Sequence, residues 1–176
     1  VYTPPQSDVH CIEDLASQPD VNIEIGNLIH IYGKDCDGQV EAISNAGFEV
    51  GMGSARLAII LESKTLWELP SFFELYKVVA SSLAQFSGQQ INAGVVRIIT
   101  DHLRTISVLV VNNVVPGNKK EQFVLRKMIR SCCELIWIQT EKSGSISNIT
   151  HDFCEVFVPE YLTAVTQIVT AEEQKF

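Results

Sequence analysis

The sequence predicts an α+β fold: a single domain in which an antiparallel or mixed sheet packs with about three helices. Three observations lead to this prediction. Short runs of β-branched and apolar residues recur along the chain, and turn residues such as Asp37-Gly38 separate them. Three longer stretches carry apolar residues at helical spacing. A length of 176 residues with 46% hydrophobic residues is enough for one sizeable core.

The first part of the chain is predicted to be an irregular arm followed by a β-rich region. Residues 1–20 form the arm, because Thr3-Pro4-Pro5 favours an extended backbone and no periodicity is established before Val21. Residues 21–176 form the α+β domain. Asp37-Gly38 is a strong hairpin turn, since both residues tolerate positive φ. A second turn is expected at Asn45-Ala46-Gly47, and the strands of this region are expected at 27–32, 39–43, 48–50 and 55–61.

Helices are expected near 70–86, 118–134 and 159–170. Thr65 and Glu68 have the spacing of a capping box and form a short turn before Pro70, which can occupy the first position of a helix. Asn118 and Glu121 have the same spacing before the second helix.

A second hairpin is predicted between the first two helices. Residues 95–99 and 106–111 are β-branched, apolar runs of strand length, and the polar residues 101–104 between them are taken as the turn. Residues 135–138 are expected to return as a strand after the second helix, and residues 146–149 to form a short edge strand.

The charge is uneven along the chain. The net charge is −8, which argues against general nucleic-acid binding, yet residues 97–130 carry seven Lys/Arg and two Asp/Glu, a formal charge of +5. The basic residues of the second helix are therefore candidates for a partner-binding surface; they are Lys119, Lys120, Arg126, Lys127 and Arg130. The alternative is an ordinary solvated helix face.

Motifs for catalysis or cofactor binding are weak. His151, Asp152 and Cys154 place an imidazole, a carboxylate and a thiol close in sequence, but nucleophilic catalysis needs a geometry that adjacency does not give. Gly51-Met52-Gly53-Ser54 lacks the third glycine and the Lys-Ser/Thr pair of a phosphate loop. Asp101-His102 is explained by turn chemistry. No cofactor, metal or small-molecule ligand is predicted.

The cysteines indicate a compartment. Five cysteines are an odd number without the spacing of a disulfide framework, so an intracellular, reducing, cytoplasmic setting is expected. Every apolar run is shorter than the roughly 20 residues that a membrane span requires.

Residues 123–153 resemble part of a known family. A helix with Arg126-Lys127 is followed by Leu135-Ile136, by Glu141-Lys142-Ser143-Gly144 and by residues 149–153. This order resembles the C-terminal part of the matrix proteins of animal rhabdoviruses. The resemblance implies a non-enzymatic protein that self-associates, condenses a nucleocapsid and contacts a membrane peripherally.

These observations predict a non-catalytic assembly protein that acts by self-association and protein binding, in its most concrete form a viral matrix-like scaffold. Nucleic acid is not directly indicated as a partner. One alternative is an adaptor subunit of a cellular complex. The other, from a different class, is a small hydrolase or transferase that uses His151 and Cys154.

Overall fold

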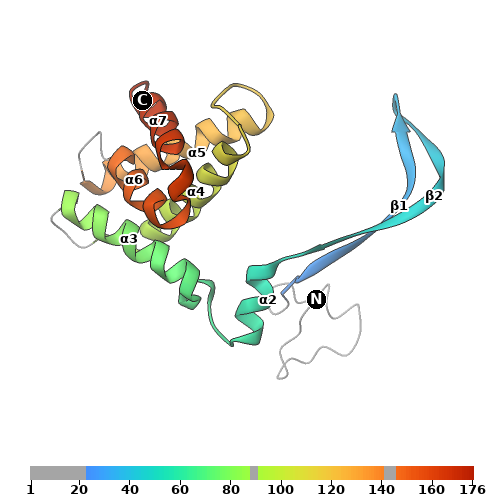
Figure 1. Cartoon of the computed structure of the whole chain (residues 1–176), viewed down its shortest axis with the longest axis horizontal. Helices are drawn as coiled ribbons and strands as arrows, with labels where there is room; N and C mark the ends of the chain where they lie inside the picture. Colours follow the sequence, from blue (N-terminus) through green and yellow to red (C-terminus); the bar gives the residue numbers. More distant parts are fainter. Residues whose placement is uncertain (1–22, 88–90, 141–145) are drawn as a thin grey trace. The chain divides into compact units, whose positions relative to one another are not determined.

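The computed structural model describes residues 23–87, 91–140 and 146–176 (Figure 1). The chain divides into two compact units, one up to Leu69 and the other from Pro70 to Phe176. The first holds a β-hairpin and a short helix, and the second is helical. The predicted α+β class with an antiparallel sheet is therefore confirmed.

The hairpin of the first unit forms where the sequence predicts it. Strands β1 (Gly26–Cys36) and β2 (Gln39–Met52) pair antiparallel and form the two-stranded ribbon in Figure 1. Asp37 and Gly38 connect them with φ angles of 54° and 86°, and the Gly38 amide donates to Asp35 Oδ1 at 2.8 Å. The predicted turn is confirmed, because these two residues accept the positive φ that a tight hairpin requires.

The expected second turn lies inside β2 instead. Ile31 pairs with Gly47 and Gly33 pairs with Ala42, so the register shifts between these two pairs. The four residues 43–46 lie opposite a single residue of β1, which is a β-bulge. The chain at Asn45-Ala46-Gly47 therefore accommodates extra residues without reversing direction.

The strand predicted at 55–61 is wrong, because this segment forms helix α2 (Ser54–Leu61). The helix is tied to the start of the hairpin through backbone groups. The Gly53 amide donates to the Ile25 carbonyl at 2.9 Å, and Arg56 Nη1 donates to the Glu24 carbonyl at 2.8 Å. These contacts join segments far apart in sequence, and local strand propensity does not reveal them.

The predicted turn before Pro70 is confirmed. Residues Leu66–Glu68 form a 3-10 helix with a capping box in which Glu68 Oε2 accepts from the Thr65 amide at 2.7 Å. That hydrogen bond is the largest cause of the lowered pKa of Glu68. Helix α3 (Pro70–Ser87) then begins at Pro70, where the missing amide proton is not needed.

The second unit continues with α4 (Ala93–Val111), α5 (Lys120–Thr140), α6 (Ile146–Phe157) and α7 (Leu162–Glu173), which a 3-10 turn at Pro159–Tyr161 precedes. The three predicted helices are thus present as α3, α5 and, with its 3-10 turn, α7. Helix α5 begins at Lys120 and runs on to Thr140, so the predicted strand at 135–138 is wrong. The predicted edge strand at 146–149 is also wrong, because these residues form the first turn of helix α6.

The predicted hairpin at 95–111 is the largest error, since the whole segment is helix α4. Its buried residues recur three and four positions apart: Val96, Ile99, Thr100, Leu103, Ile106, Ser107 and Val110. Helix α4 contacts α3, α5, α6 and α7, so burial of this stripe outweighs the strand propensity of its β-branched residues.

The hydrophobic core of the second unit lies among its helices. Its members come from α3 to α7, whereas no residue of β1 or β2 is buried. The irregular arm predicted at 1–20 lies outside the described residues, and the predicted domain boundary stays a prediction. Among the described helices, none has the length and apolar character needed to cross a membrane.

We expect Ile106→Ala and Val108→Ala to separate the helix from a strand at this position. Ile106 is 0% exposed and Val108 is 47% exposed, because the two lie about 200° apart around a helix. Ile106→Ala should lower the free energy of unfolding by about 2–5 kcal/mol, and Val108→Ala by about 0.5 kcal/mol or less. Denaturant unfolding measures both. Similar losses would indicate that the two residues share a face, as they would in a strand.

Candidate functional site

Part of the predicted basic surface comes together on helix α5. Arg126, Lys127 and Arg130 line a surface hollow of about 320 Å³ together with Phe123, Ser131 and Glu134. Lys119 precedes the helix and Lys120 is its first residue, and neither lines the hollow. Three of the five predicted residues therefore share one site.

The buried stripe of α5 decides which residues face outward. Its buried residues are Leu125, Ile129, Cys132, Cys133 and Ile136. Residues three and four positions apart are neighbours on a helix surface, so Phe123 and Lys127 form one row beside a second row of Arg126, Arg130 and Glu134. The sequence thus places three cations and an aromatic ring on the same face.

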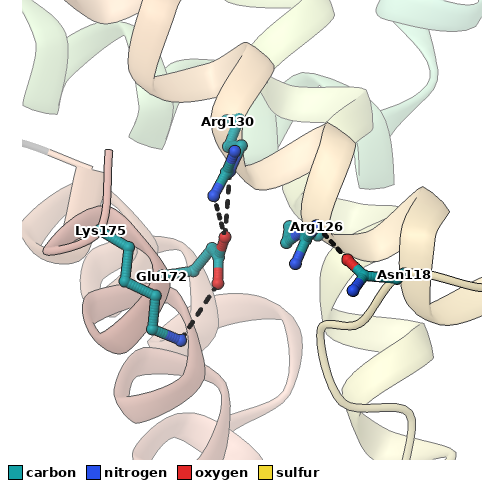
Figure 2. Close-up of polar contacts among 5 residues, drawn as sticks. All are labelled: Asn118, Arg126, Arg130, Glu172 and Lys175. Atoms are coloured by element: carbon teal, nitrogen blue, oxygen red, sulfur yellow. Dashed lines mark hydrogen bonds and ion pairs between the residues drawn. The ribbon is translucent and has the colours of Figure 1, made fainter.

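Arg126 is positioned by the loop that precedes the helix. Its Nη2 donates to the side-chain oxygen of Asn118 (Figure 2). The predicted helix-capping role of Asn118 is therefore wrong: its oxygen accepts from a side chain eight residues later. Figure 2 shows this pair beside Arg130.

Arg130 is positioned by the last helix. Its Nε and Nη2 both lie 3.0 Å from Glu172 Oε1, and Lys175 Nζ lies 3.3 Å from Glu172 Oε2 (Figure 2). The Glu172 side chain is only 3% exposed, whereas that of Arg130 is 42% exposed. A buried carboxylate thus holds a guanidinium that still reaches solvent, which fixes α5 against α7.

The neighbouring carboxylate performs a different role. Glu173 Oε1 accepts from the Ile146 amide at 3.1 Å, at the first residue of α6, and Glu173 Oε2 accepts from Ser147 Oγ. A carboxylate at this position satisfies a free amide and interacts favourably with the helix dipole. Adjacent residues of α7 therefore connect it to both α5 and α6.

One face of the hairpin offers a second candidate site. Asn27 pairs with Gly51, Ile29 with Glu49 and Ile31 with Gly47, so these six side-chain positions share a face. A Cβ atom placed on Gly47 or Gly51 would meet no atom within 4 Å. The Glu49 carboxylate therefore lies on this face between two positions that carry no side chain.

His151, Asp152 and Cys154 do not form a catalytic group. Cys154 is buried, with its Sγ 3.8 Å from Ser107 Oγ, whereas His151 is exposed, with its Nδ1 3.8 Å from Asp152 Oδ1. Asp152 Oδ2 accepts from Ser82 Oγ at 2.6 Å, and so connects α6 to α3. Burial raises the pKa of the Cys154 thiol, the opposite of what a nucleophile needs.

Asp101 and His102 lie within α4 and not on a turn. His102 is half-buried, and desolvation lowers its pKa. Across residues 23–87, 91–140 and 146–176, no three His, Cys, Asp or Glu side chains are grouped closely enough to hold a metal ion.

Comparison with known proteins decides the family. The model of the class II (A) tRNA synthetases matches residues 8–176. The chain belongs to this family. The match includes the hairpin, α2 and the helical unit, so both candidate sites lie within it.

The similar proteins include several bacterial alanine–tRNA ligases. That of Vesicomyosocius okutanii is 34% identical over 166 residues, covering 88% of this chain and 19% of the relative. That of Nitrosomonas eutropha is 25% identical over 164 residues, covering 88% and 18%. The chain therefore spans about a fifth of the length of these relatives.

The family corrects the functional predictions. The resemblance to rhabdovirus matrix proteins is wrong, because the synthetase model matches nearly the whole chain. The predicted non-catalytic, self-associating scaffold and the prediction that the chain is no enzyme are wrong for the same reason. The alternatives, an adaptor subunit or a hydrolase or transferase using His151 and Cys154, do not fit either. The prediction of no small-molecule ligand conflicts with the family, because its relatives are named for alanine and tRNA. The same names indicate a nucleic-acid partner for these relatives, which the sequence analysis did not directly indicate for this chain.

The sequence analysis did not predict the hairpin face or the position of Phe123 in the lining of the hollow. The glycines at 47 and 51 flank Glu49 at the period of two that places all three on one side of a strand, and this signal was readable. Phe123 precedes Arg126 and Lys127 at helical spacing, which was also readable. The contacts of Asn118 with Arg126 and of Arg130 with Glu172 carry no comparable signal.

We expect the helical-unit thiols to resist alkylation in the folded protein. Cys132, Cys133 and Cys154 are buried, and desolvation raises the pKa of Cys133 to about 12. A variant with Cys11→Ser and Cys36→Ser should therefore label negligibly at pH near 8. Mass spectrometry before and after denaturation measures the labelling. Rapid labelling of the folded variant would contradict the burial of these residues.

Proposed function

We propose that this chain is part of an alanine–tRNA ligase and that helix α5 binds the tRNA through Arg126, Lys127 and Arg130. The observation that carries this proposal is the grouping of three cations on one exposed helix face. We infer the tRNA substrate from the names of the relatives, since several of them are alanine–tRNA ligases.

The contacts of these cations suit phosphate binding. Arg126 and Arg130 are oriented by Asn118 and Glu172, so less side-chain freedom remains to be lost on binding. Lys127 is exposed, and within the described part of the chain it has no ion pair. Guanidinium and ammonium groups arranged in this way neutralise RNA phosphates and release counterions.

The acidic balance of the chain does not oppose this function. The net charge of −8 is a property of the whole chain, whereas exposed charges interact over a Debye length of about 10 Å at 0.1 M salt. Glu134 is the one carboxylate among the residues lining the hollow, and Glu172 pairs with Arg130, so Arg126 and Lys127 contribute most of the positive charge at a phosphate on α5.

We expect the double reversal Arg126→Glu, Lys127→Glu to weaken tRNA binding strongly. Each lost phosphate contact should reduce the slope of log Kd against log salt by about one, so the slope should fall by roughly two. Fluorescence anisotropy with a labelled alanine tRNA transcript across salt concentrations measures both affinity and slope.

Lys77→Glu is the control for the single reversal Lys127→Glu, because each changes the net charge by two units. Lys77 is an exposed cation on α3, where it pairs with Glu74 at 2.8 Å. Its reversal changes the net charge at a different face of the same helical unit and should leave the salt slope unchanged. Equal effects of α5 and Lys77 reversals would indicate a response to net charge alone and would contradict binding through α5.

The hairpin face is our candidate for the alanine site. Alanine carries an ammonium group and a small methyl group. Glu49 offers a carboxylate to the ammonium, and the open positions at Gly47 and Gly51 leave room for the remaining atoms.

We expect Glu49→Gln to weaken alanine binding by about tenfold or more, because a charged hydrogen bond contributes about 1.5–3 kcal/mol. Titration of backbone amide resonances with alanine, and with lactate as an analogue lacking the ammonium, measures this. Lactate should bind the wild type and Glu49→Gln equally poorly. Glu41→Gln, another exposed carboxylate of β2, is the control. Unchanged alanine binding by Glu49→Gln would rule out this role.

A further inference from the structure

We propose that a hollow between α3, α4 and α6 binds a small organic anion in which one carboxylate is joined to an apolar or aromatic group. The hollow has a volume of about 400 Å³. It shares no lining residue with the basic hollow of α5, so it is a site separate from the proposed tRNA-binding face. Its lining combines an apolar wall with one cation.

Four apolar side chains form the wall of this hollow. Phe72 and Leu75 come from α3, and Val156 and Phe157 come from the end of α6. Phe72 and Leu75 are 8% and 5% exposed, so the core holds them in place, whereas Val156 is 53% exposed. An apolar group of a ligand that covers this wall would remove its exposed part from water, which favours binding.

Arg104 of α4 is the cation of the hollow. Its guanidinium carbon lies 4.8 Å from the centre of the Phe72 ring. A guanidinium stacked on a ring is held in one orientation, and the N–H groups at its edge stay available to accept a carboxylate in a paired arrangement. Phe72 therefore orients the charge of Arg104 without neutralising it.

The charge of Arg104 is not compensated by the surrounding side chains. Within residues 23–87, 91–140 and 146–176 it forms no ion pair, and this includes Asp101 one turn earlier on α4. Glu74 is the one carboxylate among the lining residues, and it pairs with Lys77 at 2.8 Å. The hollow thus favours a ligand that carries a single negative charge.

The size and lining of the hollow indicate a small molecule. A volume of about 400 Å³ lies within the range of roughly 300–1,000 Å³ that is usual for small-ligand sites, which are mostly apolar with a few polar groups. A stable protein partner would need about 800 Å² of surface on each side. A nucleic-acid backbone would place polar groups against the apolar wall, where they would lose hydrogen bonds to water.

The experiment titrates backbone amide resonances of the 176-residue chain with 4-phenylbutyrate. This probe should perturb the residues of the hollow and bind with a Kd of about 1 mM or tighter. The neutral 4-phenylbutyramide should bind about tenfold more weakly or worse. Arg104→Gln should weaken binding of the acid by about tenfold or more, since it removes a hydrogen bond between charged groups, and should leave binding of the amide unchanged.

Three further variants test the position of the site. Glu74→Gln removes the carboxylate of the lining and should bind the acid as tightly as wild type or more tightly. Val156→Glu adds a carboxylate at the exposed wall and should weaken binding. Val108→Glu is its matched control, because Val108 is 47% exposed on α4 and lies outside the lining. Its binding should equal that of wild type.

Equal binding of 4-phenylbutyrate by wild type and Arg104→Gln would overturn the proposal, as would perturbations that lie away from the hollow. Perturbation of the hollow by polyuridylate but not by the probe would assign Arg104 to nucleic acid and would also overturn it. None of these outcomes depends on tRNA binding by α5, which the salt dependence of the α5 variants tests separately.

Discussion

The packing of α4 among four other helices is the constraint on which the helical unit depends. Seven of its residues are buried, and it contacts α3, α5, α6 and α7. Its two buried hydroxyl groups make hydrogen bonds within the helix, since Thr100 Oγ1 and Ser107 Oγ donate to the carbonyls of Val96 and Leu103 at 2.7 and 2.8 Å. These side chains can therefore be buried without a hydrogen-bond partner from another helix. Helices α3, α5, α6 and α7 can then pack directly against α4.

The arrangement of α5 follows from this packing. Leu125, Ile129 and Ile136 point into the core, so the basic residues of the same helix must point away from it. Helix α7 contributes the two carboxylates that hold α5 and α6 in place. Glu172 binds Arg130 from a buried position, and Glu173 caps α6, so one turn of α7 fixes both neighbouring helices. The candidate tRNA-binding face is thus built on a rigid helix, which favours precise placement of charge.

The two units differ in how they would recognise their ligands. The hairpin offers a carboxylate between two glycines, which suits a small cationic group. The helical unit offers a group of cations on α5, which suits phosphates. This division agrees with a family whose similar members are named for alanine and for tRNA. The acidic chain still carries a local group of cations, because α5 holds four of the 13 Lys/Arg residues and three of these four line the hollow.

The sequence alone determined the features that depend on neighbouring residues. The Asp37-Gly38 turn, the capping box of Thr65 and Glu68 and the helix beginning at Pro70 follow from backbone preferences within a few positions. It also singled out the basic helix, three of whose five named residues line the hollow. Only the tertiary structure decided that 95–111 is a helix, because its β-branched residues suit either conformation and burial against four helices selects one. The partners of Arg126 and Arg130 were likewise decided by the fold. Asn118 lies in the preceding loop and Glu172 lies 42 residues away from Arg130, and contacts between separate segments depend on a packing that local preferences do not encode.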